Sequence, residues 1–243
     1  MMTRRELLGT GAAVVATAAI AQAQPSGKGG GTSTRGDAFL GKHEPKPLPF
    51  DPKKLAGLSE KLLVSHHDKN YAGAVKNLNK VEEQLAQIGP DTAGFVVTGL
   101  ELAKLKFTNS MILHEMYFGN LGGDGKAAGS ATEKEIVRAF GSYARFEELF
   151  RALGMGLAGG SGWAILDWDF HAAGARIYWA GDHTRAVAFG SPLLVLDMFE
   201  HAYAMDYGAD AKQYVDAFMK NVNWHEVEKR LARAQKAQAA LKA

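Results

Sequence analysis

Hydrophobic positions recur at helical spacing in two long segments of the first half of the chain. The first segment begins near Leu58, with Ser59 as its candidate N-cap, and ends at the Gly89-Pro90 pair. The second segment runs to Phe118 and is followed by a glycine-rich stretch. Two long helices joined by a short break predict an antiparallel helical hairpin.

The pattern changes after residue 126. Residues 133–156 are typical of two short helices, and three apolar runs with β-branched and aromatic residues predict strands at residues 162–166, 175–179 and 193–196. From Asp210 the pattern is helical again, with an alanine- and lysine-rich end that we expect to be solvated. We therefore expect an α+β fold, with an N-terminal antiparallel α-hairpin domain (residues 48–126) followed by an α/β domain (residues 127–243) that contains a small three-stranded antiparallel sheet.

The first 23 residues have the pattern of a twin-arginine signal peptide. Arg4 and Arg5 precede an apolar run of small residues, and Ala21-Gln22-Ala23 is a candidate cleavage site. The apolar run is too short for a permanent membrane anchor. Residues 24–47, rich in Gly, Ser and Pro, predict a flexible linker and an extended lead-in. We expect export to the periplasm, or secretion, by the twin-arginine pathway.

Composition narrows the chemistry that the chain can perform. The 243 residues are 47% hydrophobic and 22% charged, which fits a globular protein with a sizeable core. A formal net charge of +2 gives no reason to expect a nucleic acid or an anionic membrane surface as partner. Cysteine is absent from the sequence, so only His, Asp or Glu side chains could hold a metal ion, and thiol chemistry is excluded.

Four residues are candidate metal ligands. Asp197 ends the apolar run 193–196, His201 follows one helical turn later, and His66 and His114 lie on the apolar sides of the two hairpin helices. Carboxylate and imidazole groups suit a metal that prefers oxygen and nitrogen donors. Each residue alone has a simpler explanation, an exposed acid at a strand end or a histidine satisfied in the core.

The motifs around these residues are similar to those of the iron/manganese superoxide dismutases, over roughly residues 48–227. The motifs are LSEKLLVSHHDKNYAGAVKNLN, HEMYFGNL, FGSYARFEELF, GSGWAIL, DMFEHAYAMDY and NVNWHEV. The resemblance implies one Fe or Mn ion per chain, held by His66, His114, Asp197 and His201. It also implies an antioxidant oxidoreductase that converts superoxide to oxygen and hydrogen peroxide.

The sequence departs from the family's usual residues around the implied metal. Asn70 and Ala74 stand where the family usually has a histidine and a tyrosine that gate the approach of substrate, and Phe199 replaces a tryptophan. Ser110 stands at one of the two positions from which the family places a glutamine beside the metal. His183 stands at the other position, and some members of the family use a histidine there.

Two further positions, Trp163 and Glu200, hold the residue that is usual in the family. In the family this glutamate bonds to a metal-binding histidine of the partner chain. The resemblance thus implies a homodimer. The short apolar run of the signal pattern separately predicts that the mature form has no membrane anchor. The departures leave three functions open: a superoxide dismutase, a redox metalloenzyme of the same fold that acts on another small substrate, and a non-catalytic metal-binding protein.

Overall fold

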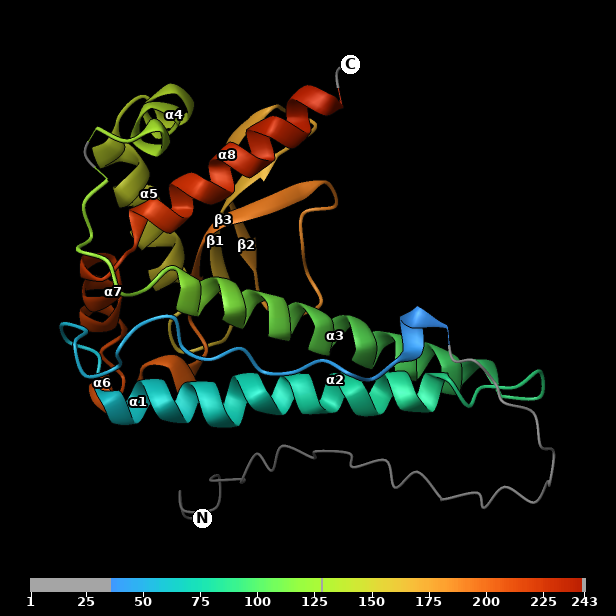
Figure 1. Ribbon diagram of the computed structural model, residues 1–243. Coiled ribbons are helices and arrows are strands. Elements are labelled where there is room, and N and C mark those ends of the chain that lie inside the picture. The colour runs from blue at the N-terminus through green and yellow to red at the C-terminus, as the bar shows by residue number, and fades with distance from the viewer. Residues whose placement is uncertain (1–35, 128, 242–243) are drawn as a thin grey trace, which may run out of the picture. The chain divides into compact units, whose positions relative to one another are not determined.

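The predicted helical hairpin is present in the computed structural model, which describes residues 36–127 and 129–241 (Figure 1). Its first arm comprises α1 (Glu60–Ser65), the π-helical turn η2 (His66–Tyr71) and α2 (Ala72–Leu85), and its second arm is α3 (Gly94–Gly119). The short helix η1 (Asp37–Phe39) precedes them. The predicted signal peptide and the first part of the predicted linker lie outside the described residues.

The first arm begins as the sequence predicts but differs in its interior. The Ser59 hydroxyl accepts a hydrogen bond from the Leu62 N–H at 3.0 Å, as expected of an N-cap. The hydrophobic pattern predicts one continuous α-helix, whereas the structure has a π-helical turn that begins at His66. Such a turn holds an extra residue, and a periodicity of 3.6 cannot show a single turn of this kind.

Two short helices and a three-stranded sheet follow, also as predicted. The helices are α4 (Ala131–Phe140) and α5 (Tyr143–Gly156), capped by Ser130 and Ser142. The strands β1 (Trp163–Asp169), β2 (Gly174–Ala180) and β3 (Gly190–Asp197) form a sheet in the order β2-β1-β3, and both pairings are antiparallel. The α+β fold class is therefore confirmed.

The C-terminal part contains four helical elements and corrects one expectation. These are η3 (Glu200–Ala202), α6 (Ala204–Tyr207), α7 (Ala211–Lys220) and α8 (Trp224–Ala240). The alanine- and lysine-rich end was expected to be solvated, but Ala234 and Gln238 of α8 are buried. The indole N–H of Trp168 donates to Oε1 of Gln238 at 3.2 Å. Small alanine side chains let one face of α8 pack closely, while its lysines remain on the other face.

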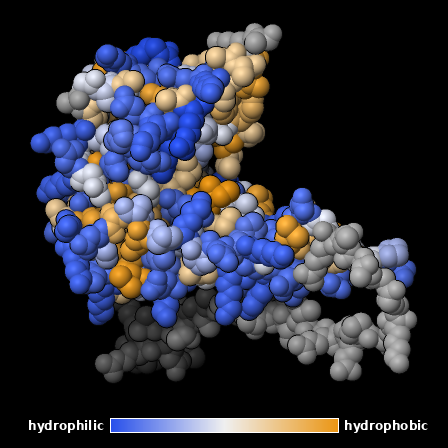
Figure 2. All heavy atoms as spheres, viewed as in Figure 1, coloured by the Kyte–Doolittle hydropathy of each residue, from blue (hydrophilic) through white to orange (hydrophobic). Residues whose placement is uncertain are grey.

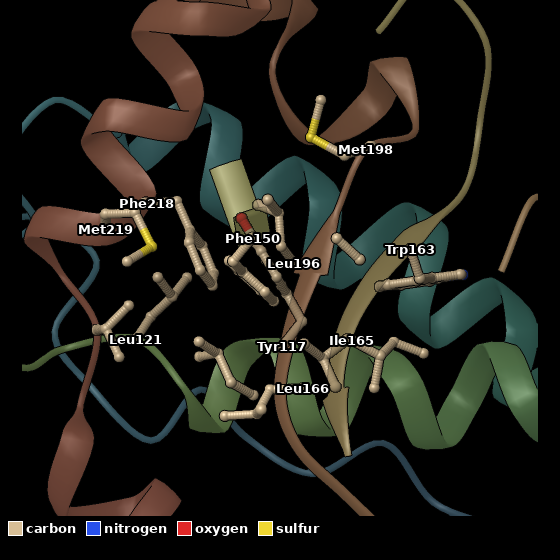
Figure 3. Close-up of a cluster of buried hydrophobic side chains, with 14 of the residues drawn as sticks. Tyr117, Leu121, Phe150, Trp163, Ile165, Leu166, Leu196, Met198, Phe218 and Met219 are labelled. Atoms are coloured by element: carbon tan, nitrogen blue, oxygen red, sulfur yellow. The ribbon is translucent and has the colours of Figure 1, made fainter. Parts of the chain in front are cut away.

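The sheet lies between α3 on one side and α5 and α8 on the other (Figure 1). Figure 3 shows the apolar side chains that join these layers, including Tyr117 of α3, Phe150 of α5, Leu196 of β3 and Phe218 of α7. This core draws on residues from both predicted domains, and the division at residue 126 stays a prediction. Among the described residues, no helix has the length and apolar character needed to cross a membrane.

The edge strand β3 is tied to the end of α3 by the side chain of Asn120. Its Oδ1 accepts from the Val195 N–H at 2.9 Å, and its Nδ2 donates to the Leu193 carbonyl at 3.2 Å. Arg230 of α8 also donates to the Leu193 carbonyl, at 3.1 Å. These bonds satisfy backbone groups that an edge strand would otherwise leave unpaired. They fix the position of the strand that ends in Asp197.

One acidic residue, Asp167 of β1, is buried within the sheet. Its side chain accepts a hydrogen bond from the Ser191 N–H at 2.8 Å. Burial raises the pKa of Asp167 to about 7; the hydrogen bond from Ser191 opposes this rise, and the nearby Asp169 adds to it. The folded protein therefore holds a proton on Asp167 at pH values where the unfolded chain has released it.

We expect ionisation of Asp167 to lower the free energy of unfolding, so that the stability of the protein depends on pH. Because the pKa is higher in the folded state, the free energy of unfolding falls as the pH rises from about 4 to about 7. The Asp167→Asn variant lacks this fall, so its stability relative to the wild type should rise by roughly 1–3 kcal/mol between pH 4.5 and 8. Urea unfolding at several pH values measures the difference. The exposed Asp91→Asn is the control, and a wild-type–Asp167→Asn difference independent of pH would contradict the expectation.

Candidate metal centre

Four side chains from four different elements converge on one point. His66 begins η2, His114 lies in α3, Asp197 ends β3 and His201 lies in η3. One candidate donor atom from each residue lies within 4.8 Å of the donor atoms of the others. The structure thus brings together the four residues that the sequence suggested as ligands.

The donor atoms surround the Asp197 carboxylate at similar distances. Asp197 Oδ2 lies 3.1 Å from Nε2 of His66, 3.3 Å from Nε2 of His201 and 3.6 Å from Nε2 of His114. Metal–ligand bonds of about 2.0–2.2 Å place neighbouring donors about 3.0–3.6 Å apart at angles of about 90–120°. The spacing fits ligands that share one ion.

The hydrogen bonds of the cluster leave the donor atoms available. His114 Nδ1 donates to the Ser110 carbonyl at 2.7 Å, so in a neutral ring the lone pair lies on Nε2. Asp197 Oδ1 accepts from the Phe199 N–H at 2.8 Å, which leaves Oδ2. Oδ2 and the three Nε2 atoms are buried, with no hydrogen-bond partner in the described part of the chain. Buried polar atoms without partners are rare, and a bound cation would satisfy all four.

The protonation states also suit a cation. Burial lowers the pKa of His114 to about 3, and burial is also the main cause of the lowered pKa of His66. Burial alone would raise the pKa of Asp197, but its contacts with His201 and His66 more than offset this and hold the pKa well below its usual range. Neutral imidazoles beside an ionised carboxylate give the cluster lone pairs and a negative charge.

The four residues differ in exposure. The side chains of His66, His114 and Asp197 are at most 1% exposed, whereas that of His201 is 25% exposed. His201 is thus the residue of the cluster nearest the surface of the single chain. The other three residues are enclosed by aromatic side chains, with the rings of Tyr117 and Phe118 centred 5.1 and 5.0 Å from that of His66.

His183 lies beside this cluster, as part of a stack of rings. The indole N–H of Trp163 donates to His183 Nδ1 at 3.0 Å, and the Trp163 ring lies 5.1 Å from that of His114. The His183 ring stacks on Phe199, with ring centres 4.6 Å apart and planes 9° from parallel. Asn109 Nδ2 donates to the His183 carbonyl at 2.7 Å. Nothing in the hydrophobic pattern indicates Asn109, which faces this loop from α3.

The remaining positions indicated by the resemblance lie as follows. Asn70 is half-buried in η2, and Ala74 is buried in α2. Ser110 is buried and contributes its carbonyl, which fixes the His114 ring, rather than a side-chain amide. Glu200 is exposed, and its carboxylate makes no hydrogen bond or ion pair within residues 36–241 as far as they are described. The roles of these residues stay predictions.

One contact to the cluster could not be read from the sequence. The Tyr214 hydroxyl of α7 donates to the Asp197 carbonyl at 2.7 Å, and its oxygen lies 3.3 Å from that of Tyr117. Both tyrosines are fully buried. Their helical spacing in the sequence predicts ordinary core residues. The structure shows in addition that Tyr214 holds the last residue of β3, with Tyr117 beside it.

A helical hairpin packed on a small antiparallel sheet, with a buried His₃Asp cluster between them, defines a candidate mononuclear metalloprotein. Residues 128–230 match the model of the family described as iron/manganese superoxide dismutases, C-terminal domain. The chain is 48% identical over 193 residues to the superoxide dismutase [Fe] of Cupriavidus metallidurans, a match that covers 79% of this chain and 98% of that protein. It is also 34% identical over 201 residues to superoxide dismutase [Mn] 1 of Halobacterium salinarum (80% and 98% covered) and 33% identical over 212 residues to the superoxide dismutase [Fe] of Aquifex pyrophilus (84% and 98% covered).

The chain therefore belongs to the iron/manganese superoxide dismutase family, whose members are oxidoreductases that act on superoxide. The resemblance found in the sequence motifs is confirmed.

Removing one imidazole should empty the site. His114→Ala deletes a buried donor and leaves a gap that no neighbouring donor can fill, so we expect the metal content per chain to fall at least roughly ten-fold. Elemental analysis of protein expressed and purified in parallel measures this. His171→Ala, which changes an exposed histidine outside the cluster, is the matched control. Undiminished metal in His114→Ala would show that the cluster does not hold it.

Proposed function

We propose that this chain is a superoxide dismutase whose single Fe or Mn ion is held by His66, His114, Asp197 and His201. The observation that carries the proposal is the set of four buried donor atoms that have no hydrogen-bond partner among the described residues. The relatives support it, because the three described above are named as superoxide dismutases of Fe or Mn. They give no support to a different substrate or to a non-catalytic role.

Each residue of the site has a definable task in this proposal. The bound metal would supply one-electron chemistry, alternating between its +2 and +3 states as it oxidises one superoxide to oxygen and reduces the next to peroxide. Asp197 supplies negative charge that favours the higher oxidation state, and His66 and His114 keep their lone pairs because burial holds these two rings neutral. His201, the ligand with the greatest exposure in the single chain, lies next to Glu200, where the proposed homodimer would form.

We also propose that His183 performs the hydrogen-bonding task of the family's glutamine. Indole nitrogen can only donate, so Nδ1 of His183 is the acceptor in its bond to Trp163. Burial lowers the pKa of His183, which favours the neutral ring, and the single ring proton then lies on Nε2. Trp163 and Phe199 therefore hold a histidine beside His114 with a defined donor atom. Such groups around a metal tune its potential.

Substitutions at position 183 test this role. His183→Gln restores an amide donor and should keep most of the activity, whereas His183→Ala should lower kcat by roughly ten-fold or more. The midpoint potential of the metal-loaded protein provides a second measurement, and it should shift in His183→Ala more than in His183→Gln. Equal potentials and equal rates in all three proteins would rule out the proposed hydrogen bond.

The function itself is tested on the purified wild type. We expect close to one Fe or Mn ion per chain after expression without added metal, and dismutation of superoxide much faster than that by the same concentration of the free ion. Elemental analysis and a superoxide-consumption assay give the two numbers. Protein that contains neither metal would refute the metal site. A loaded protein no faster than the free ion would refute the dismutase and leave the site intact.

Export and assembly complete the proposal. The twin-arginine pattern supports export, and Lys substitutions at Arg4 and Arg5 should retain the protein in the cytoplasm, as cell fractionation would show.

The exposed Glu200, next to His201 and without a partner in the described chain, supports a homodimer. Sedimentation of wild type and Glu200→Ala would test whether this carboxylate contributes to the dimer.

A further inference from the structure

A second site is suggested by a cavity of about 320 Å³ between α3, the edge strand β2 and the loop that leads to β3. Its walls are largely apolar and include Ile112 of α3, Ile165 of β1 and Val187 of the loop. None of the four residues of the metal cluster lines it. Figure 2 shows hydrophobic residues in a recess of the surface above α3, where this loop descends in Figure 1. The volume lies within the range of small-molecule sites, about 300–1,000 Å³.

The cavity wall contains a buried carboxyl group, that of Asp167. The residue is only 3% exposed. Its Oδ1 accepts one hydrogen bond, from the Ser191 N–H at 2.8 Å. Among the described residues, no Lys, Arg or His side chain pairs with Asp167, and its Oδ2 accepts no hydrogen bond. Buried acids are normally paired with a positive charge or a full set of donors, so this group has unused capacity.

The surrounding backbone is shaped around this carboxylate. The pairing of β1 with β3 is interrupted between Leu166 and Asp167, and the residue opposite Asp167 is Pro192, which has no N–H to donate. A Cβ atom at position 190 would overlap the Asp167 carboxylate, so a larger residue there would displace this group. Irregularities of this kind re-aim a side chain and are frequent beside functional sites. Their combination holds the carboxylate in place without a charged partner.

The second charged side chain of the lining, Arg185, is already engaged. Its guanidinium carbon lies 4.9 Å from the centre of the Trp179 ring, and its Nε lies 3.7 Å from Asp182 Oδ2. The Tyr178 hydroxyl, on β2, donates to Asp169 at 2.7 Å. Asp167 is thus the charged group of the lining that a ligand can still pair with. The aromatic side chains of Tyr178 and Trp179 add apolar area to the lining for the body of a ligand.

We propose that this cavity binds a small organic ammonium ion with an apolar body, whose charged nitrogen pairs with Asp167. The body of the ligand occupies the space between Ile112, Ile165 and Val187. This inference does not depend on the dismutase proposal, because the cavity and the metal cluster have no residue in common. In this interpretation the unpaired carboxyl group of Asp167 has a function, because its positively charged partner arrives with the ligand.

Benzylamine is a suitable probe, because it combines a primary ammonium group with one apolar ring. Calorimetric titration of the full-length, metal-loaded protein at pH 8 should show saturable binding at one site per chain. At this pH a carboxyl group with a pKa of about 7 is ionised. Benzyl alcohol, which has the same ring without the charge, should bind at least roughly ten-fold more weakly. Failure of the wild type to bind benzylamine, or equal binding of the two probes, would overturn the proposal.

Two variants separate the charge from the cavity. Asp167→Asn removes the charge at nearly constant volume and should weaken benzylamine binding at least roughly ten-fold. Asp91→Asn, in the exposed turn between α2 and α3 and outside the lining, makes the same chemical change and should leave the affinity unaltered. Ile112→Trp fills the cavity from its partly exposed side and should abolish binding while Asp167 remains.

Circular dichroism and metal content establish that each variant is folded before titration. Should Asp167→Asn fail to fold, the pair Ile112→Trp and Asp91→Asn still decides the outcome. Unchanged affinity in folded Asp167→Asn, or in folded Ile112→Trp, would place benzylamine elsewhere and refute the site.

Discussion

The burial of one carboxylate among three imidazoles is the interaction on which the arrangement of this protein depends. Asp197 is completely enclosed, and its Oδ2 lies within 3.6 Å of three histidine nitrogens. A buried anion is strongly unfavourable unless positive charge or hydrogen bonds compensate it. Its carbonyl and its Oδ1 are satisfied by Tyr214 and by the Phe199 N–H. The donor atoms around its Oδ2 are imidazole nitrogens, so a cation at the centre would compensate the remaining negative charge of the carboxylate.

The helices and strands that meet there are joined by a few long-range polar contacts. Asn120 ties the end of α3 to β3, which fixes His114 relative to Asp197. Ser59, the cap of the first arm, also bonds to Asp206 through its N–H at 2.7 Å and its hydroxyl at 2.6 Å. Asp206 follows His201 by five residues, so this contact couples the helix that leads to His66 with the segment that carries His201. These contacts fix the positions of the elements that carry the donor atoms relative to one another.

The sequence was most informative where local rules decide the structure. The Ser59 cap, the glycine-rich end of the hairpin and the three apolar runs of the sheet depend on neighbours in the chain, and the structure agrees with them. The four clustered residues could be proposed because two helices and a strand end each present one donor. The π-helical turn, the Tyr214 contact and the buried face of α8 could not be predicted, because they depend on partners that are distant in sequence. The burial of Asp167 could not be predicted either, because a single acidic residue in a strand pattern usually indicates an exposed position.

The π-helical turn also determines the direction in which His66 points relative to α2. An α-helix advances about 100° per residue, so a one-residue deletion rotates everything on one side of it by about that angle relative to the other side. His66 stands at the start of η2, and the face of α2 that packs on α3 follows it. Shortening η2 to an ordinary α-helical turn would therefore keep the hairpin's hydrophobic contacts and turn His66 away from the centre. The metal site therefore requires the four donor residues and also the helix rotation that directs His66 toward the other three. A chain that keeps all four residues but lacks this rotation would lose the site.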